Sequence, residues 1–122
     1  MAIGDQWSTE CRGLVFTIGH SNHSAERLAA LLKRHRIEVL VDIRSRPYSR
    51  HAPQFNASGI EAILSGNGIR YLFLGRELGG KPEEETFYDT KGRVDYALVE
   101  RSRPFLDGIK RVEREIQSNR VT

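Results

Sequence analysis

Three short segments of this chain carry residue types that bind anions or exchange protons. They span residues 19–22, 42–46 and 77–80, and each closely follows an apolar run. Arginine side chains bind phosphate or carboxylate groups through paired hydrogen bonds, and imidazole and carboxylate groups transfer protons to or from substrates. Together the segments predict a polar, anion-binding pocket that also holds candidate acid–base groups.

The first segment is Gly19, His20, Ser21 and Asn22, between a short apolar run and a predicted helix. Gly19 permits a tight turn or a close backbone approach, and the free N–H groups of a helix N-terminus suit an anion. Ser21 and Asn22 add donors, and His20 is a candidate catalytic residue. The segment matches neither a P-loop nor a dinucleotide-binding fingerprint. A turn with polar capping residues explains the same pattern equally well.

The second segment begins with Asp42, a carboxylate inside a run that otherwise favours burial. A buried carboxylate is costly without a partner, and arginine supplies two hydrogen bonds at once. Arg44 and Arg46 alternate, so on an extended backbone both point to one side and are candidates for anion binding. A salt bridge from Asp42 that pins the loop is the structural alternative. We favour function, with Asp42 orienting the arginines or exchanging protons, because several donors converge where the topology predicts a crevice.

The third segment holds Glu77, Gly79 and Gly80. Glu77 is a candidate general base or an orienting group for an arginine. Paired glycines adopt backbone shapes that other residues cannot, so Gly79 and Gly80 are expected to approach the anion. A plain glycine-rich loop is an equal alternative. Tyr71, in the preceding apolar run, is expected to be a core residue with a tethered hydroxyl.

The elements that position these segments alternate along the chain. Apolar, β-favouring runs predict strands at residues 14–18, 39–43 and 69–74. Helices are predicted after a Ser24 cap, at 57–64, at 95–101 and after a Ser102 cap. Residues 75–94 are predicted to form a long loop, and Val121 with Thr122 to begin another strand.

Strand–helix–strand units of this length form right-handed crossovers onto a parallel sheet. We therefore expect a three-layer, Rossmann-like α/β domain over residues 14–122, with a small, mostly parallel sheet flanked by helices and residues 1–13 as a lead-in. The carboxyl ends of parallel strands form the ligand crevice in such folds, so the three polar segments should meet at one sheet edge. The last predicted helix should cover the sheet with Phe105, Ile109, Val112 and Ile116.

The composition narrows the class of protein. At 122 residues the chain has the length of one domain, and its net charge of +3 suits an anionic ligand without demanding nucleic acid. The single cysteine, Cys11, excludes an internal disulfide and a cysteine-ligated zinc cluster, and favours a reducing compartment. No apolar run approaches the ~20 residues that a membrane span needs, so we expect a cytoplasmic protein without membrane contact. The sequence identifies neither a metal site nor a cofactor.

Three longer stretches around the polar segments, residues 17–22, 41–50 and 69–80, closely resemble the bacterial and archaeal family named domain of unknown function 488. The resemblance extends from about Leu14 to the end of the chain and implies a polar pocket at the positions named above. Members of that family typically continue into a strand and a loop with Cys-Glu and Cys-His-Arg sequences, which do not follow Thr122 here. We therefore expect a C-terminally truncated domain whose sheet lacks its last strand, with an open edge that favours a homo-oligomer.

Two classes of function remain open at this point. In the first, the chain is an enzyme or binding domain that acts on a phosphate-bearing small molecule, such as a nucleotide, or on a nucleic-acid-like substrate. In the second, it is a non-catalytic module that binds nucleic acid or a protein through its arginine loop. The salt dependence of binding separates the two classes. Affinity for a nucleic acid falls steeply with salt concentration because several phosphates are contacted, whereas affinity for one small anion falls only slightly.

Overall fold

The structure, a computed structural model, describes residues 14–19, 24–48, 50 and 53–122, so the expected lead-in lies outside it. The helices are α1 Ala25–Arg34, α2 Ala57–Gly66, α3 Gly75–Leu78, α4 Tyr96–Val99 and α5 Arg103–Ser118, the strands are β1 Val39–Asp42 and β2 Arg70–Phe73, and the 3-10 turns are η2 Pro53–Phe55 and η3 Glu85–Phe87. Among the described residues, none of these helices combines the length and apolar character that crossing a bilayer requires.

The two strands form a parallel pair in which Val39 lies opposite Arg70 and Asp42 lies opposite Phe73. Because side chains alternate along a strand, this register fixes which residues share a face. Leu40 and Asp42 of β1 share one face with Tyr71 and Phe73 of β2, and Val39 and Arg70 share the other. The strands predicted at 39–43 and 69–74 are both present, each shorter by one residue at one or both ends.

The last residues of the chain extend this sheet. Val121 forms parallel bridges to both Val15 and Val39, so it lies between the 14–18 segment and β1. The strand predicted at 14–18 is reduced to the bridge at Val15. Beside it, the Phe16 N–H donates to the Val121 carbonyl (2.9 Å). The strand predicted to begin at Val121 is present as this pair of bridges.

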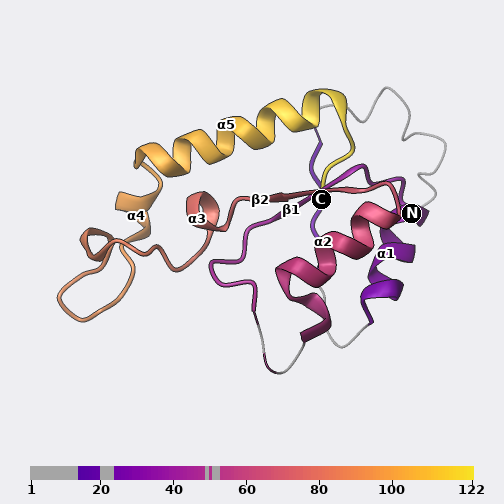
Figure 1. The fold of residues 1–122 in the computed structure, drawn as a ribbon. Coiled ribbons are helices and arrows are strands. Elements are labelled where there is room, and N and C mark those ends of the chain that lie inside the picture. The colour runs from indigo at the N-terminus through magenta and orange to yellow at the C-terminus, as the bar shows by residue number, and fades with distance from the viewer. Residues whose placement is uncertain (1–13, 20–23, 49, 51–52) are drawn as a thin grey trace.

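Helices α1 and α2 cover one face of the sheet (Figure 1). Helix α1 begins as predicted, since the Ser24 Oγ accepts a hydrogen bond from the Arg27 N–H (3.1 Å). Apolar residues recur along α1 at helical spacing, and those that are buried are Ala25, Leu28, Ala29 and Leu32. They form the core with residues of α2 and the sheet, among which Leu64 of α2 and Phe55 of η2 are almost fully buried.

Helix α5 lies on the opposite face of the sheet (Figure 1). The Ser102 Oγ caps it by accepting from the Phe105 N–H (3.4 Å), and Glu115 ties it to β2 through an ion pair with Arg70. Its predicted apolar stripe is only partly covered, because Ile109 is 37% exposed while Gly108 and Glu115 are the buried residues of the helix. Helices thus flank a small parallel sheet on both faces, which confirms the predicted three-layer α/β architecture.

The loop predicted at residues 75–94 contains two elements that the sequence analysis missed, α3 and η3. Glycines in this segment were taken to indicate a loop, whereas Gly75 is the first residue of α3. Glycine is needed at this position because the neighbouring backbone is close. A Cβ on Gly75 would lie 2.1 Å from the Arg44 carbonyl oxygen. Helix α3 packs against α5 at Gly108, where a Cβ would meet the Cβ of Glu77 at 2.7 Å and the side chain of Leu78 at 2.9 Å.

The contact at Gly108 predicts the effect of one added methyl group. We expect Gly108→Ala to lower the free energy of unfolding by about 1–3 kcal/mol, since overpacking forces α3 and α5 apart. Urea unfolding measures this change. Gly59→Ala is the matched control, because a Cβ there meets only the Gln54 carbonyl oxygen at 3.9 Å, an ordinary contact. Equal stability of the two variants would contradict close packing of α3 on α5.

Candidate functional site

The Asp42 carboxylate lies at the carboxyl end of β1 and is 5% exposed. Its Oδ1 accepts hydrogen bonds from the Arg44 backbone N–H (3.1 Å) and from Arg44 Nε (2.9 Å). Its Oδ2 accepts from Arg44 Nη2 (2.8 Å) and from the Tyr71 hydroxyl (2.7 Å). Both carboxylate oxygens are therefore satisfied by two donors each, and the tethered hydroxyl expected of Tyr71 is confirmed.

The same bonds hold the Arg44 guanidinium in one orientation. Besides Asp42, Arg44 Nη2 donates to the Phe55 carbonyl oxygen (2.7 Å), so the side chain joins β1 to η2. These contacts use Nε and Nη2, and Nη1 is the nitrogen that they do not use. The Arg44 side chain is 28% exposed, so it is reached from solvent although its position is fixed.

Asp42, Arg44 and Tyr71 change one another's pKa values. Burial raises the pKa of Asp42, but the hydrogen bonds from Arg44 and Tyr71 outweigh burial and leave that pKa below its ordinary value. The hydrogen bond to Asp42 raises the pKa of Arg44. Burial and the bond to Asp42 raise the pKa of Tyr71. Asp42 is thus a carboxylate and Tyr71 a neutral donor at neutral pH, an arrangement suited to orienting Arg44.

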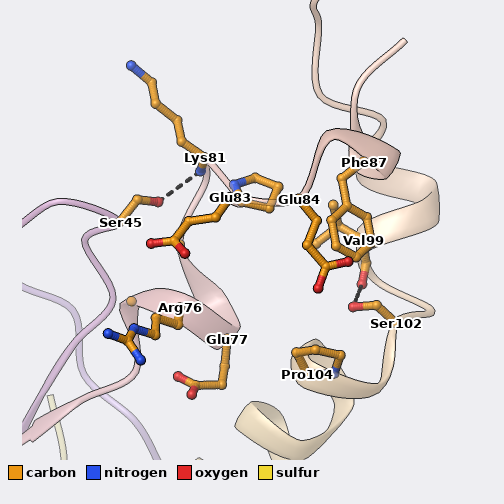
Figure 2. A pocket seen from close by; sticks show the side chains of 13 residues that line it. Ser45, Arg76, Glu77, Lys81, Glu83, Glu84, Phe87, Val99, Ser102 and Pro104 are labelled. Atoms are coloured by element: carbon orange, nitrogen blue, oxygen red, sulfur yellow. Dashed lines mark hydrogen bonds between the residues drawn. The ribbon is translucent and has the colours of Figure 1, made fainter.

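The second and third polar segments contact each other directly, as the topology predicts. The Lys81 backbone N–H donates to the Ser45 Oγ (2.9 Å; Figure 2). A Cβ on Gly79 would lie 2.3 Å from the same Ser45 Oγ, and Gly79 is buried. Only glycine permits this approach, which explains one of the paired glycines that the sequence analysis selected.

Two cavities are lined by residues of these polar segments. The first, which we call the arginine cavity, has a volume of about 200 Å³ and is lined by Asp42 and Arg44 together with apolar side chains that include Ile18 and Phe55. The second, the glutamate cavity, has a volume of about 220 Å³. It is lined by Ser45 and by residues of α3, of the following segment and of the start of α5, Glu77 among them.

The structure brings some of the predicted site residues together and leaves others apart. Gly19 is exposed and follows Ile18, a wall residue of the arginine cavity. Arg46 is exposed, and so is Gly80, whose carbonyl accepts from the Tyr96 hydroxyl (3.0 Å). Glu77 belongs to the glutamate cavity and not to the arginine cavity. The remaining predicted residues, His20, Ser21 and Asn22, lie outside the described residues.

Several wall residues were not anticipated from the sequence. Glu83, Glu84 and Phe87 line the glutamate cavity, and the Phe55 carbonyl holds Arg44. A backbone carbonyl is common to all residues, so the residue type of Phe55 gives no indication of its role. Adjacent glutamates after a proline are typical of a solvent-exposed loop, so Glu83 and Glu84 gave no signal of a cavity. Within the part of the chain that the structure describes, no group of His, Cys, Asp or Glu side chains is arranged to hold a metal ion.

Comparison with protein families identifies a match over most of the chain. The family model described as domain of unknown function DUF488 matches residues 24–122. Neither the curated proteins nor the solved structures that were searched include a significant match.

The lowered pKa of Asp42 predicts a pH-dependent contribution to stability. A depressed carboxyl pKa stabilises the fold above the unfolded-state pKa, and this contribution is lost as the pH falls through the folded-state pKa. We expect Asp42→Asn to lower the free energy of unfolding by roughly 3 kcal/mol at neutral pH, and by progressively less in acid. Urea unfolding across the acidic range measures both.

Asp107→Asn serves as the control for that series. Asp107 forms an exposed ion pair with Arg103 on α5 (3.4 Å), and surface pairs of this kind contribute about 0–1 kcal/mol. A loss in Asp42→Asn that stays constant down to strongly acidic pH would show that the Asp42 charge does not stabilise the fold.

Proposed function

This chain belongs to the domain of unknown function DUF488 family, and from the geometry of its own residues we propose that it binds a small anion in the arginine cavity. The ligand class that fits best is a phosphate or phosphate monoester. The observation that carries the proposal is the orientation of Arg44 by Asp42 and Tyr71.

An arginine held in this way is a prepared anion receptor. Its rotamer entropy is lost on folding and not on binding, so binding is stronger than to a free side chain. The carboxylate that orients it leaves Nη1 for the ligand. Partial exposure of the side chain, at 28%, provides access for an anion. Asp42 then acts as an orienting group, since its pKa is lowered and both of its oxygens are already bonded.

The other predicted donors complete the proposal. Arg46 is exposed two residues beyond Arg44 and adds a second positive charge to the same loop. The segment of Gly19, His20, Ser21 and Asn22 follows Ile18, a wall residue of the cavity, in the sequence, and we propose that it contributes further donors. His20 is then the candidate for proton exchange with the ligand.

The size and lining of the cavity indicate the ligand class. A volume of about 200 Å³ holds a phosphate group and a few further atoms, and the apolar walls favour a short carbon chain over a second charge. A nucleotide would place its phosphate near Arg44 and leave most of its base outside. We therefore infer a small phosphorylated or carboxylated molecule, or the phosphate end of a larger one.

A second candidate function rests on exposed residues of the loop that follows Arg44. Tyr48 is 69% exposed, and Arg46 and Arg50 on either side are exposed too. Aromatic rings with flanking cations bind single-stranded nucleic acid, because bases stack on the ring while arginines contact the phosphates. This arrangement favours nucleic acid as the alternative partner.

The test is titration of the protein with inorganic phosphate, with a phosphate monoester and with a short single-stranded oligonucleotide. We expect Arg44→Lys and Arg46→Gln each to weaken phosphate binding by about tenfold, the effect of about 1.4 kcal/mol. Arg103→Gln is the control, since Arg103 is 89% exposed on α5. Amide chemical shifts around Asp42 and Arg44 report the place of binding.

Three outcomes are informative. Shallow salt dependence together with shifts near Arg44 supports the anion pocket. A steep salt dependence with the oligonucleotide, lost in Tyr48→Ala, supports the nucleic-acid alternative. Phosphate binding that Arg103→Gln weakens as much as Arg44→Lys would contradict a site at Arg44.

A further inference from the structure

The arginine cavity lies between two segments of the sheet. Residues 121–122 pair with the 14–18 segment on one side and with β1 on the other. The cavity lies farther along in the same direction, since Ile18 lines it together with residues 41–43. Within the described residues it therefore has the form of a slot, with main chain along two of its sides.

Two backbone groups on the β1 side of the slot are free to bind a ligand. Hydrogen-bonding directions alternate along a strand of a parallel sheet. The Val39 and Val41 N–H groups donate toward residues 120–122, whereas the Asp42 carbonyl accepts from the chain just after β2 (2.9 Å). By this alternation the Val41 carbonyl and the Ile43 N–H lie on the slot side. Neither group has a hydrogen-bond partner among the described residues.

An acceptor followed by a donor two residues later is the pairing pattern of a β-strand. A ligand that adds to such an edge binds through its own main chain. A single amino-acid residue uses both groups, because its N–H donates to the Val41 carbonyl and its carbonyl oxygen accepts from the Ile43 N–H. Its main chain then runs parallel to β1, so its carbonyl end lies toward Arg44.

The position of Arg44 indicates that this end of the ligand is a carboxylate. Arg44 lines the same cavity, and its Nη1 is not used by the bonds to Asp42 and Phe55. A terminal carboxylate accepts from the Ile43 N–H with one oxygen and from Arg44 Nη1 with the other. Hydrogen bonds between two charged groups are stronger than those between neutral ones, so a carboxylate is favoured over an amide.

The apolar walls indicate the side chain of the ligand. A residue paired in this way lies opposite Asp42, so its side chain is on the face that Leu40 and Asp42 share. The cavity wall on that face includes four buried apolar side chains, those of Leu28, Leu40, Phe55 and Ile60. Ile18 at the rim is 38% exposed. A volume of about 200 Å³ holds a side chain of leucine size, which would cover Ile18 and remove its apolar surface from water.

We propose that the arginine cavity binds an N-acylated amino acid with an apolar side chain. Its carboxylate binds Arg44 and the Ile43 N–H, its amide N–H binds the Val41 carbonyl, and its side chain packs among Ile18 and the buried wall residues. Thr122 occupies the neighbouring place between the two segments, so the slot has room for one residue and a short acyl group. This inference rests on the anion site at Arg44 and narrows its ligand to a carboxylate.

The experiment titrates the protein with N-acetylleucine and with three analogues, each of which lacks one of the recognised groups. N-acetylleucine amide lacks the carboxylate, N-acetylglycine lacks the side chain, and N-acetyl-N-methylleucine lacks the N–H. We expect N-acetylleucine to bind saturably, to shift the amide resonances of Ile43 and Arg44, and to bind about tenfold more tightly than each analogue, equal to about 1.4 kcal/mol.

One substitution separates this recognition from simple anion binding. Ile18→Ala removes part of the apolar wall and no charge, so it should weaken N-acetylleucine binding about fivefold and leave inorganic phosphate binding unchanged. Leu106→Ala is the matched control, since Leu106 is 45% exposed on α5 and does not line the cavity.

The outcomes distinguish the two proposals. If N-acetylglycine and inorganic phosphate bind at Arg44 as tightly as N-acetylleucine, the inference fails while the anion site stands. If neither phosphate nor any carboxylate shifts the Arg44 amide, both fail. Equal binding of N-acetylleucine and its amide contradicts a carboxylate at Arg44, and equal binding of the N-methyl analogue contradicts pairing with Val41. An effect of Leu106→Ala as large as that of Ile18→Ala also contradicts the site.

Discussion

A carboxylate at the end of a buried strand stays charged only if donors replace the water that it has lost. In this protein Asp42 meets that condition with four hydrogen bonds, three from Arg44 and one from Tyr71. The donors come from the following loop and from the neighbouring strand, and Arg44 in turn binds the carbonyl of Phe55 in η2. One side chain thus holds together both strands and the turn that leads to α2. The hydrogen bonds to the Asp42 carboxylate therefore hold the loop after β1 in place.

Close backbone contacts at three glycines connect the loop after β1 to α3, and α3 to α5. Gly75 approaches the Arg44 carbonyl, Gly79 approaches Ser45, and Gly108 lets α5 lie against Glu77. None of the three positions has room for a methyl group without movement of its neighbours. These three contacts therefore hold α3 and α5 close to the loop that carries Arg44 and Ser45.

The sequence predicted the elements with strong periodicity and clear caps. Ser24 and Ser102 cap α1 and α5 as expected, and both strands of the parallel pair were anticipated from apolar runs. It also predicted that Asp42 needs an arginine. The sequence favoured a functional role for Asp42 over a salt bridge that pins the loop. The structure shows that salt bridge, and the same bonds orient Arg44. The missed helix α3 and the glutamate cavity depend on glycines used for close approach, and residue type alone does not distinguish these from flexible glycines.

The bridges made by Val121 have a consequence for how the protein acquires its structure. Val121 pairs with Val15 and Val39, and the Thr122 hydroxyl donates to the Phe16 carbonyl from 106 residues away. Contacts between such distant parts of a chain slow folding, because the loop between them must close before they contribute any stability. Helices α1 and α2 can pack on β1 early, whereas the sheet gains its middle partner only when residues 120–122 arrive. During synthesis on the ribosome, the edge of β1 that receives Val121 therefore stays open until nearly the whole of this sequence has emerged.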